Sequence, residues 1–235
     1  MSDLCVEIAG QPLLLLPEKA LYWPAQRCLL LADLHLGKAA AFRRLGQPVP
    51  RGTTEANLAR LDRVLARHPC ERLVVLGDFL HAREALGAAQ RAQLAAWRAR
   101  WPALAVALVR GNHDRHAGDP PAELGIEVLD QPLLAGPFAL CHEPQAHPTH
   151  HVLAGHLHPA FRLRGRGRQQ LRLPCFCSDP GTTLLPAFGD FTGSLEVSAA
   201  AGRRLFVVAD GAVLAVPGAP AQASEIPVRV IPKRS

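Results

Sequence analysis

The chain has 235 residues, of which 49% are apolar but only 5% aromatic, and its formal net charge is +6. This length suits one domain of generous size with a core of Leu, Val and Ala. No apolar run reaches the roughly 18 residues that a membrane span needs, so we expect no membrane segment. The first residues lack the pattern of a signal peptide, which favours a cytoplasmic protein. The positive charge favours an anionic partner such as nucleic acid.

The first half of the chain alternates apolar runs with amphipathic segments. Short buried strands are predicted in "CLLLADLHLG", "RLVVLGDFLH" and "LAVALVRGNHD". Between them, residues 52–68 and 84–101 carry apolar side chains at helical spacing. This order of strands and helices predicts right-handed crossovers and a parallel arrangement of the strands.

The later half consists of short apolar runs divided by Gly and Pro, which suggests hairpins. Because the end is rich in proline, we expect one domain over residues 1–215 and a loosely ordered tail over residues 216–235. The six cysteines form no CxxC pair. Without an export signal they are expected to be reduced, mostly buried thiols that carry no chemistry.

Polar clusters stand at the ends of the three early strands and in two later segments. Sites in open α/β sheets form beyond the carboxyl ends of strands, so we expect the clusters to converge. Gly77, Gly111 and Gly155 each precede a polar residue, where we expect the backbone to turn sharply. The clusters comprise Asp33 and His35; Asp78; Asn112, His113 and Asp114; His142; and His156 and His158.

This mixture of carboxylates, imidazoles and an amide suits Mn, Fe or Zn better than Mg. Two carboxylates and four histidines exceed the needs of one metal ion, and a pair of ions sharing a carboxylate fits the count better. Taken singly, each residue has an ordinary interpretation as a turn or loop residue. The order D-x-H, G-D, G-N-H-D, H and G-H-x-H favours a dinuclear site.

The segments "DLHLGK", "GDFLH", "GNHD", "CHEP" and "GHLHP" resemble, in the same order, the five motifs of the calcineurin-like metallophosphoesterase superfamily. Within it, "HLGKAAAFRRLGQPVPRGTTEANLARL", "LPCF" and "LLPAFGDFTG" are similar to the ligase-associated DNA damage response endonuclease branch. The resemblance spans about residues 29–193. It implies an α/β fold, a β-sandwich of mixed sheets flanked by helices in a four-layer αββα arrangement.

The resemblance also implies roles for the polar clusters. Asp33, His35 and His158 would hold one divalent metal ion, and Asn112, His142 and His156 the second, with Asp78 bridging both. Mn is favoured, with Fe or Zn as alternatives. A hydroxide between the ions would attack phosphorus in line while the metals neutralise the nonbridging oxygens. His113 would protonate the leaving oxygen, and Asp114 would orient its imidazole.

The stretch "GDFLHAR" bears on the kind of phosphate ester. Phosphoprotein phosphatases follow the bridging Asp with a D-R-G element whose Arg clamps a phosphomonoester. Here His81 stands in place of the second Asp, which favours a diester. Two alternatives stay open: Arg83 could supply the clamp, and His81 could assist the site or merely cap the next segment.

The stretch "FRLRGRGRQQLRL" alternates arginines with apolar residues around two glycines, which predicts a hairpin with one basic and one apolar face. Beginning three residues after His158, the basic face could grip a nucleic-acid backbone; a solvated surface is the alternative. Lys38, Arg43 and Arg44 would extend the basic surface. The arginines are Arg162, Arg164, Arg166, Arg168 and Arg172.

Three functions follow, in order of preference. The first is a Mn-dependent phosphodiesterase that cuts DNA as an endonuclease, in a repair pathway whose DNA ligase and helicase are candidate partners. The second is a small-molecule phosphoesterase, such as a cyclic-nucleotide or dinucleotide-polyphosphate hydrolase. The third is a non-catalytic scaffold of the same fold, which the complete set of ligands disfavours. The sequence makes no prediction of the oligomeric state.

Overall fold

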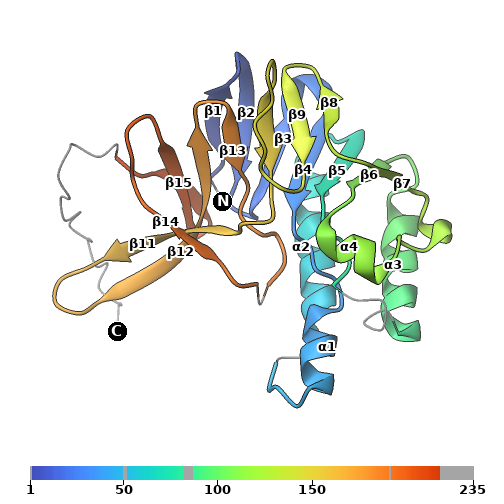
Figure 1. Ribbon diagram of the computed structural model, residues 1–235. Coiled ribbons are helices and arrows are strands. Elements are labelled where there is room, and N and C mark those ends of the chain that lie inside the picture. Colours follow the sequence, from blue (N-terminus) through green and yellow to red (C-terminus); the bar gives the residue numbers. More distant parts are fainter. Residues whose placement is uncertain (1, 50–51, 82–86, 191, 218–235) are drawn as a thin grey trace.

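The computed structural model describes residues 2–49, 52–81, 87–190 and 192–217. In these residues two β-sheets pack face to face, and the α-helices lie on the side of the first sheet (Figure 1). Most of the predicted tail, 216–235, lies outside the described residues, and so does Arg83.

The first sheet has seven strands in chain order, and its two halves differ in direction. The strands from β1 to β4 pair antiparallel, and those from β4 to β7 pair parallel. The parallel half confirms the predicted strand–helix alternation, whereas the antiparallel meander at the N-terminus was not predicted. The strands are β1 (Leu4–Ile8), β2 (Gln11–Leu16), β3 (Ala20–Trp23), β4 (Cys28–Ala32), β5 (Arg72–Leu76), β6 (Ala105–Val109) and β7 (Ile126–Leu129).

Two longer helices cover the outer face of the parallel half. Leu58 and Leu61 of α2 and Leu94 and Trp97 of α3 are buried in one cluster with alternate residues of the strands, such as Leu31. Their spacing of three or four residues places them on one face of each helix. The helices are α1 (Lys38–Arg44), α2 (Thr53–Arg67), α3 (Ala88–Arg100) and α4 (Asn112–Ala117).

The second sheet combines strands from the later half of the chain. The predicted hairpin is confirmed, because β11 and β12 pair antiparallel. The expectation of hairpins throughout this half was wrong for β9 and β10, which pair parallel. The order is β14 (Leu195–Val197), β11 (Pro159–Arg164), β12 (Gln170–Asp179), β13 (Thr182–Leu184), β10 (His151–Ala154), β9 (Phe138–Cys141) and β8 (Leu133–Ala135); β15 (Arg204–Ala209) also pairs with β12, and β16 (Ala212–Ala215) pairs with β15.

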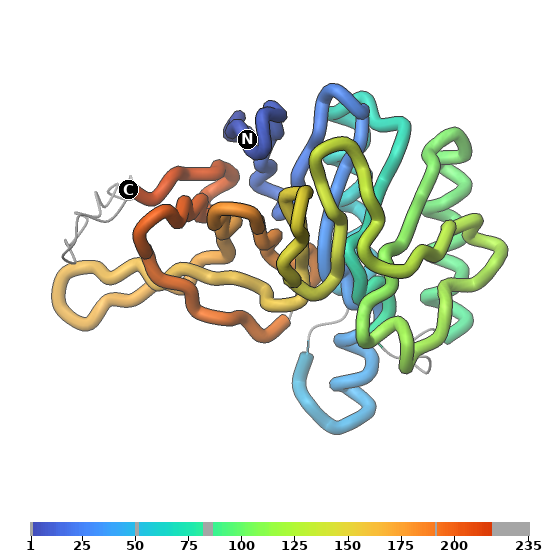
Figure 2. The backbone as a smooth tube through the Cα atoms, turned by 45° about the horizontal axis from the view of Figure 1, so that its top comes forward, coloured from blue at the N-terminus to red at the C-terminus, as the bar shows by residue number. Residues whose placement is uncertain are grey.

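Apolar residues fill the space between the two sheets. Leu30 and Val74 of the first sheet share a buried cluster with Phe138, Leu153 and Phe176 of the second. Burial on both faces explains why the parallel strands are continuous apolar runs. The predicted sandwich of mixed sheets with flanking helices is thereby confirmed. Among the described residues the helices cover the first sheet alone, which gives three of the four layers that the resemblance implies. Figure 2 shows the β11–β12 hairpin projecting from this sandwich.

Two further expectations concern the chain as a whole. None of the described helices combines the length and the apolar character that crossing a membrane requires. The six cysteines are free, and four of them are buried, as expected for thiols that pack as small apolar side chains.

Candidate metal centre

The ends of three parallel strands bring the first polar clusters together. Ala32, Leu76 and Val109 are in register across β4, β5 and β6, so the residues that follow them lie at one edge of the sheet. The second sheet supplies the later histidines to the same place, from the segments that follow β9 and β10. The side chains fall into two groups whose ligand atoms lie within 4.8 Å of one another: Asp33, His35 and His158, and Asp78, His142 and His156.

The first group surrounds the fully buried carboxylate of Asp33. Its Oδ1 lies 3.3 Å from Nε2 of His158, while its Oδ2 accepts the backbone N–H of His156 at 2.9 Å. His35 is also buried, and its Nε2 lies 3.7 Å from Oδ2 of Asp78. Asp78 therefore stands between the two groups, where a bridging ligand is expected.

The second group centres on Nε2 of the fully buried His142. This atom lies 2.8 Å from Oδ1 of Asn112, 3.1 Å from Nδ1 of His156 and 3.4 Å from Oδ1 of Asp78. The structure thus brings together all seven residues that the sequence suggested as metal ligands.

Backbone carbonyls fix the protonation of two of these imidazoles. Nδ1 of His142 lies 3.0 Å from the carbonyl of Leu76, and Nδ1 of His158 lies 2.9 Å from the carbonyl of Gly193. Because a carbonyl only accepts, each Nδ1 carries a proton, and in the neutral imidazole Nε2 then presents a lone pair. In His142 that lone pair faces the oxygens of Asn112 and Asp78, which are acceptors as well.

Several polar atoms of the site are buried without a hydrogen-bond partner: Oδ1 of Asp33, both ring nitrogens of His35, and Nε2 of His158. Buried acceptors that face one another cost free energy unless a cation or a donor lies between them. A divalent cation in the first group, to which these atoms belong, would satisfy Oδ1 of Asp33, Nε2 of His158 and one ring nitrogen of His35 together. A cation in the second group would do the same for Nε2 of His142 and the oxygens of Asn112 and Asp78 that face it. The donor set, carboxylate and amide oxygens with imidazole nitrogens, suits Mn, Fe or Zn.

The backbone of the site is strained in a consistent way. Five of the seven residues have positive φ, between +46° and +67°: Asp33, His35, Asp78, His156 and His158. Residues other than glycine adopt this region rarely, at a cost of about 1–3 kcal/mol each, and such residues cluster at functional sites. All five lie in the short loops that follow β4, β5 and β10, where the chain reverses at the edge of the sheets.

Two glycines allow the chain to approach the ligands closely. Gly77 has φ of +76°, so the predicted sharp turn is confirmed there, and a Cβ would overlap the ring of His142. Gly111 has φ of −90° and makes no such turn. Packing explains the glycine at position 111, because a Cβ there would overlap Oδ1 of Asp78.

Burial dominates the electrostatics of the site. It raises the pKa of Asp78 and lowers the pKa of His35 to about 2. Burial also opposes the charged form of His158, but the Asp33 carboxylate outweighs it and raises the pKa of His158. Charged side chains are costly here, so compensation by bound cations is favourable.

An aromatic cluster lies beside the first group. The ring of His113 lies 5.2 Å from the ring of His35, and His81 stacks on His113 at the same centroid distance. The other face of His81 stacks on Phe42 at 5.9 Å. Burial and the nearby Lys38 lower the pKa of His81 to about 4, so this imidazole is neutral. His81 therefore belongs to the wall of the site.

Asp114 differs from the expectation that it orients the imidazole of His113. Its Oδ2 accepts the N–H of Gly111 at 3.0 Å, and its Oδ1 accepts the N–H of Leu80 at 3.2 Å. The fully buried carboxylate thus caps α4 and ties it to the segment after β5. Asp78 supports His113 instead, because its Oδ1 accepts the backbone N–H of His113 at 3.0 Å.

The arginine hairpin alternates as predicted, but part of its charge is compensated. Arg162 forms an ion pair with Glu196 of β14, at 2.9 Å from Nε to Oε1, and Arg172 donates to the carbonyl of Ser194. The acid comes from a strand outside the hairpin sequence. Arg164, Arg166 and Arg168 are exposed toward the tip, and Arg43 and Arg44 lie in the last turn of α1.

The stretch "LLPAFGDFTG" supplied a resemblance in the sequence, but that its backbone holds the site in place was not predicted. The N–H groups of Phe188 and Gly189 donate to the carbonyls of Ala32 and Asp33, at 2.8 and 3.0 Å. The carbonyl of Gly193 then orients His158. These contacts use backbone atoms, so no side-chain pattern reveals them. They explain structurally why the stretch "LLPAFGDFTG" lies next to the metal centre.

Comparison with known proteins agrees with this geometry. The family profile described as calcineurin-like phosphoesterase matches residues 26–147. Among solved structures, the chain is similar to the nuclease MPE of Pseudomonas putida, with 54% sequence identity and a TM-score of 0.81. That match covers 92% of this chain and 100% of the other. No match was found among curated protein sequences.

Proposed function

The chain belongs to the calcineurin-like phosphoesterase family, and we propose that it hydrolyses phosphodiester bonds in DNA as an endonuclease. The observation that carries the proposal is the pair of ligand groups joined at Asp78, at the common end of three parallel strands. The similarity to a nuclease over almost the whole chain supports a nucleic acid as the substrate.

Asp33, His35 and His158 would hold one divalent cation, and Asn112, His142 and His156 the other, with Asp78 shared. When bound, the two cations supply a nucleophile from water near neutral pH and neutralise charge on the phosphate oxygens. The mixed nitrogen and oxygen donors favour Mn, with Fe or Zn as alternatives. The carbonyls of Leu76 and Gly193 face Nδ1 of His142 and His158, which would leave the Nε2 atoms of both residues available to the cations.

His113 would act as the general acid. Its backbone N–H is held by Asp78, and its ring lies against His35 and His81. From there the imidazole can deliver a proton to the leaving oxygen, an effect typically worth about 10²–10⁴-fold in rate. Asp114 acts further away, because it caps the helix that carries His113.

A phosphodiester is a better substrate for this wall than a phosphomonoester. The residue three positions after Asp78 is His81, which is neutral and stacked between Phe42 and His113. It supplies no bidentate cation for a dianionic terminal phosphate. Lys38 is a cation near the site among the described residues. Burial lowers its pKa, whereas the charges of Asp78 and Asp33 favour its protonated form.

The cellular role we propose is repair of DNA together with a DNA ligase and a helicase. The support is the similarity of "HLGKAAAFRRLGQPVPRGTTEANLARL" and "LLPAFGDFTG" to the ligase-associated endonuclease branch. A pull-down of ligase and helicase by the tagged chain, with and without DNA, tests direct association. Recovery of neither partner would contradict it.

Cleavage of circular single-stranded DNA and plasmid in Mn²⁺ tests the activity, with bis(p-nitrophenyl) phosphate as a small diester. A circle offers no end to an exonuclease, so its linearisation shows endonuclease action. Asp78→Asn and His113→Ala are expected to cut neither DNA, which excludes a contaminating nuclease. If wild type hydrolyses only the small diester, the centre is a phosphodiesterase but DNA is the wrong substrate.

A further inference from the structure

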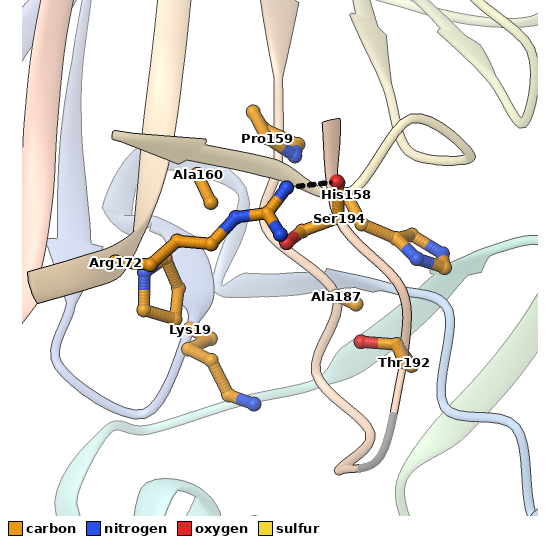
Figure 3. A pocket seen from close by; sticks show the side chains of 9 residues that line it. Lys19, His158, Pro159, Ala160, Arg172, Ala187, Thr192 and Ser194 are labelled. Atoms are coloured by element: carbon orange, nitrogen blue, oxygen red, sulfur yellow. Dashed lines mark hydrogen bonds between the residues drawn. The ribbon is translucent and has the colours of Figure 1, made fainter. Parts of the chain in front are cut away.

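A small cavity of about 140 Å³ opens beside His158, outside the two ligand groups. Its polar wall comes from Lys19, Arg172, Thr192 and Ser194, which Figure 3 shows around the space next to His158. The wall thus joins the turn between β2 and β3, the arginine hairpin and the segment that follows residue 191. None of these three elements contributes a ligand to the metal centre. The centre and the cavity share His158 alone among the lining residues.

The cations near this cavity outnumber the acids. Nζ of Lys19 lies 3.4 Å from the Oδ1 of Asp190, and Nη1 of Arg60 lies 3.2 Å from the same oxygen. Lys19 is mostly buried, with 13% of its side chain exposed. The carboxylate of Asp190 is therefore shared by two cations. Burial and the nearby charge of Arg60 lower the pKa of Lys19 to about 8.

Arg172 keeps donors available on the other side of the cavity. Its guanidinium donates to the carbonyl of Ser194 and lies beside the pocket (Figure 3). A guanidinium has five N–H donors, so this bond leaves others for an anion. The Ser194 bond fixes its position while Gly193, one residue earlier, fixes His158. The same short segment thus sets the distance between a metal ligand and a cation.

We infer that this pocket binds the backbone phosphate next to the scissile phosphodiester of a DNA strand, through Lys19 and Arg172. The inference rests on the proposed function, because it takes a phosphodiester at the metal centre as given. The pocket shares His158 with the first ligand group, so a phosphate bound in it would lie beside the one at the metal centre. A mostly buried lysine that shares its acid and an oriented arginine suit a phosphate.

The test compares kcat/KM for two substrates in Mn²⁺: bis(p-nitrophenyl) phosphate, which has one phosphate, and a single-stranded oligodeoxynucleotide. For Lys19→Met and Arg172→Met we expect about a tenfold loss on the oligonucleotide, mostly in KM, as for the removal of one charge-assisted hydrogen bond. The loss on the small diester should be much smaller. Lys19→Arg should recover part of the loss. Arg63→Met, which removes an exposed arginine from α2, is the matched control.

Neutral methylphosphonates provide a second test. Replacing the phosphate beside the cut linkage should cost wild type about as much as Lys19→Met does, and the two changes together should cost little more. A dinucleotide with a terminal phosphate in place of the neighbouring diester separates the two sources of phosphate. Preference for it over the longer strand would assign the pocket to strand ends and overturn the inference.

The outcomes separate this inference from the proposed function. Equal losses on both substrates would mean that Lys19 and Arg172 support the centre structurally, and no loss on either would mean that they bind nothing; each overturns the inference alone. If wild type hydrolyses neither substrate, the phosphodiesterase proposal fails and the pocket inference fails with it.

Discussion

The metal centre and the arginine hairpin carry the two strongest motifs of the chain, and they differ in how their charges are compensated. In the centre, the fully buried Asp33 faces Nε2 of His158, and the fully buried His142 turns its Nε2 toward oxygens of Asn112 and Asp78. On the hairpin, Arg162 already has Glu196 as a partner, and the arginines near the tip are exposed to solvent. Burial without compensation requires a ligand, whereas exposed charge does not.

This contrast decides how far each motif points to a function. Buried polar atoms of the centre lack a partner in a place that water does not reach. Their geometry therefore indicates that cations bind there. The hairpin could bind DNA or simply be solvated, and its geometry fits both. Mutations in the two regions should therefore differ greatly in effect.

The largest effect is expected for His113→Ala. Removing the general acid should lower kcat on DNA by about 10²–10⁴-fold. Because the ring is placed outside both ligand groups, the variant should retain its metal content. Parallel measurements of kcat and bound Mn check this, with exposed His116→Ala on the same helix as control. Loss of metal along with activity would place His113 among the structural supports of the centre.

The next effect concerns the close approach of two strand ends. Gly111→Ala adds a methyl group that overlaps Oδ1 of Asp78. We expect metal affinity to fall by about 10–100-fold, as when a group behind a ligand is disturbed. Titration with Mn²⁺ measures this. Gly193→Ala adds the same methyl to open space beside the centre and should keep its affinity; equal losses in both would refute the packing argument.

A smaller effect, on stability, follows from filling the centre. At a free Mn²⁺ concentration of 100 times Kd, each bound ion should add about 2.7 kcal/mol to the free energy of unfolding. For a chain of this length each ion then raises Tm by about 5–10 °C. Thermal melts with and without Mn²⁺ check the shift. An equal shift in Asp78→Asn would show that the ions bind elsewhere.

The smallest effect is expected on the hairpin. Arg164→Glu with Arg166→Glu should weaken DNA cleavage a few-fold and make its dependence on salt shallower, by about 0.7–0.9 in log–log slope for each phosphate that the arginines no longer neutralise. Hydrolysis of bis(p-nitrophenyl) phosphate should not change. Arg63→Glu controls for net charge. Unchanged DNA cleavage and salt slope would leave the hairpin as a solvated surface.

The sequence predicts much of this centre because its chemistry lies in side chains at strand ends. Asp33, Asp78 and Asn112 follow short apolar runs that alternate with amphipathic helices, a pattern that predicts parallel strands, and parallel strands end at one edge. The order of motifs then identifies the later histidines. The parallel half of the first sheet was predictable for the same reason.

What the sequence did not predict depends on backbone contacts and on distant pairs. The carbonyls that orient His142 and His158 leave no mark on residue types. Asp114 was placed wrongly because a carboxylate beside a histidine suggests a pair, whereas a capping role depends on where α4 begins. Lys19 lies in a turn with φ of +67°, far from every motif in sequence.

Manganese binding followed by electron paramagnetic resonance decides whether two cations share Asp78. We predict two Mn²⁺ per chain with a spectrum of spin-coupled ions, and loss of the coupling in Asp78→Asn. Asp119→Asn, which alters an exposed acid paired with Arg110, should leave the coupled spectrum intact. A single Mn²⁺ per chain, or two ions without coupling in the wild type, would contradict the shared centre.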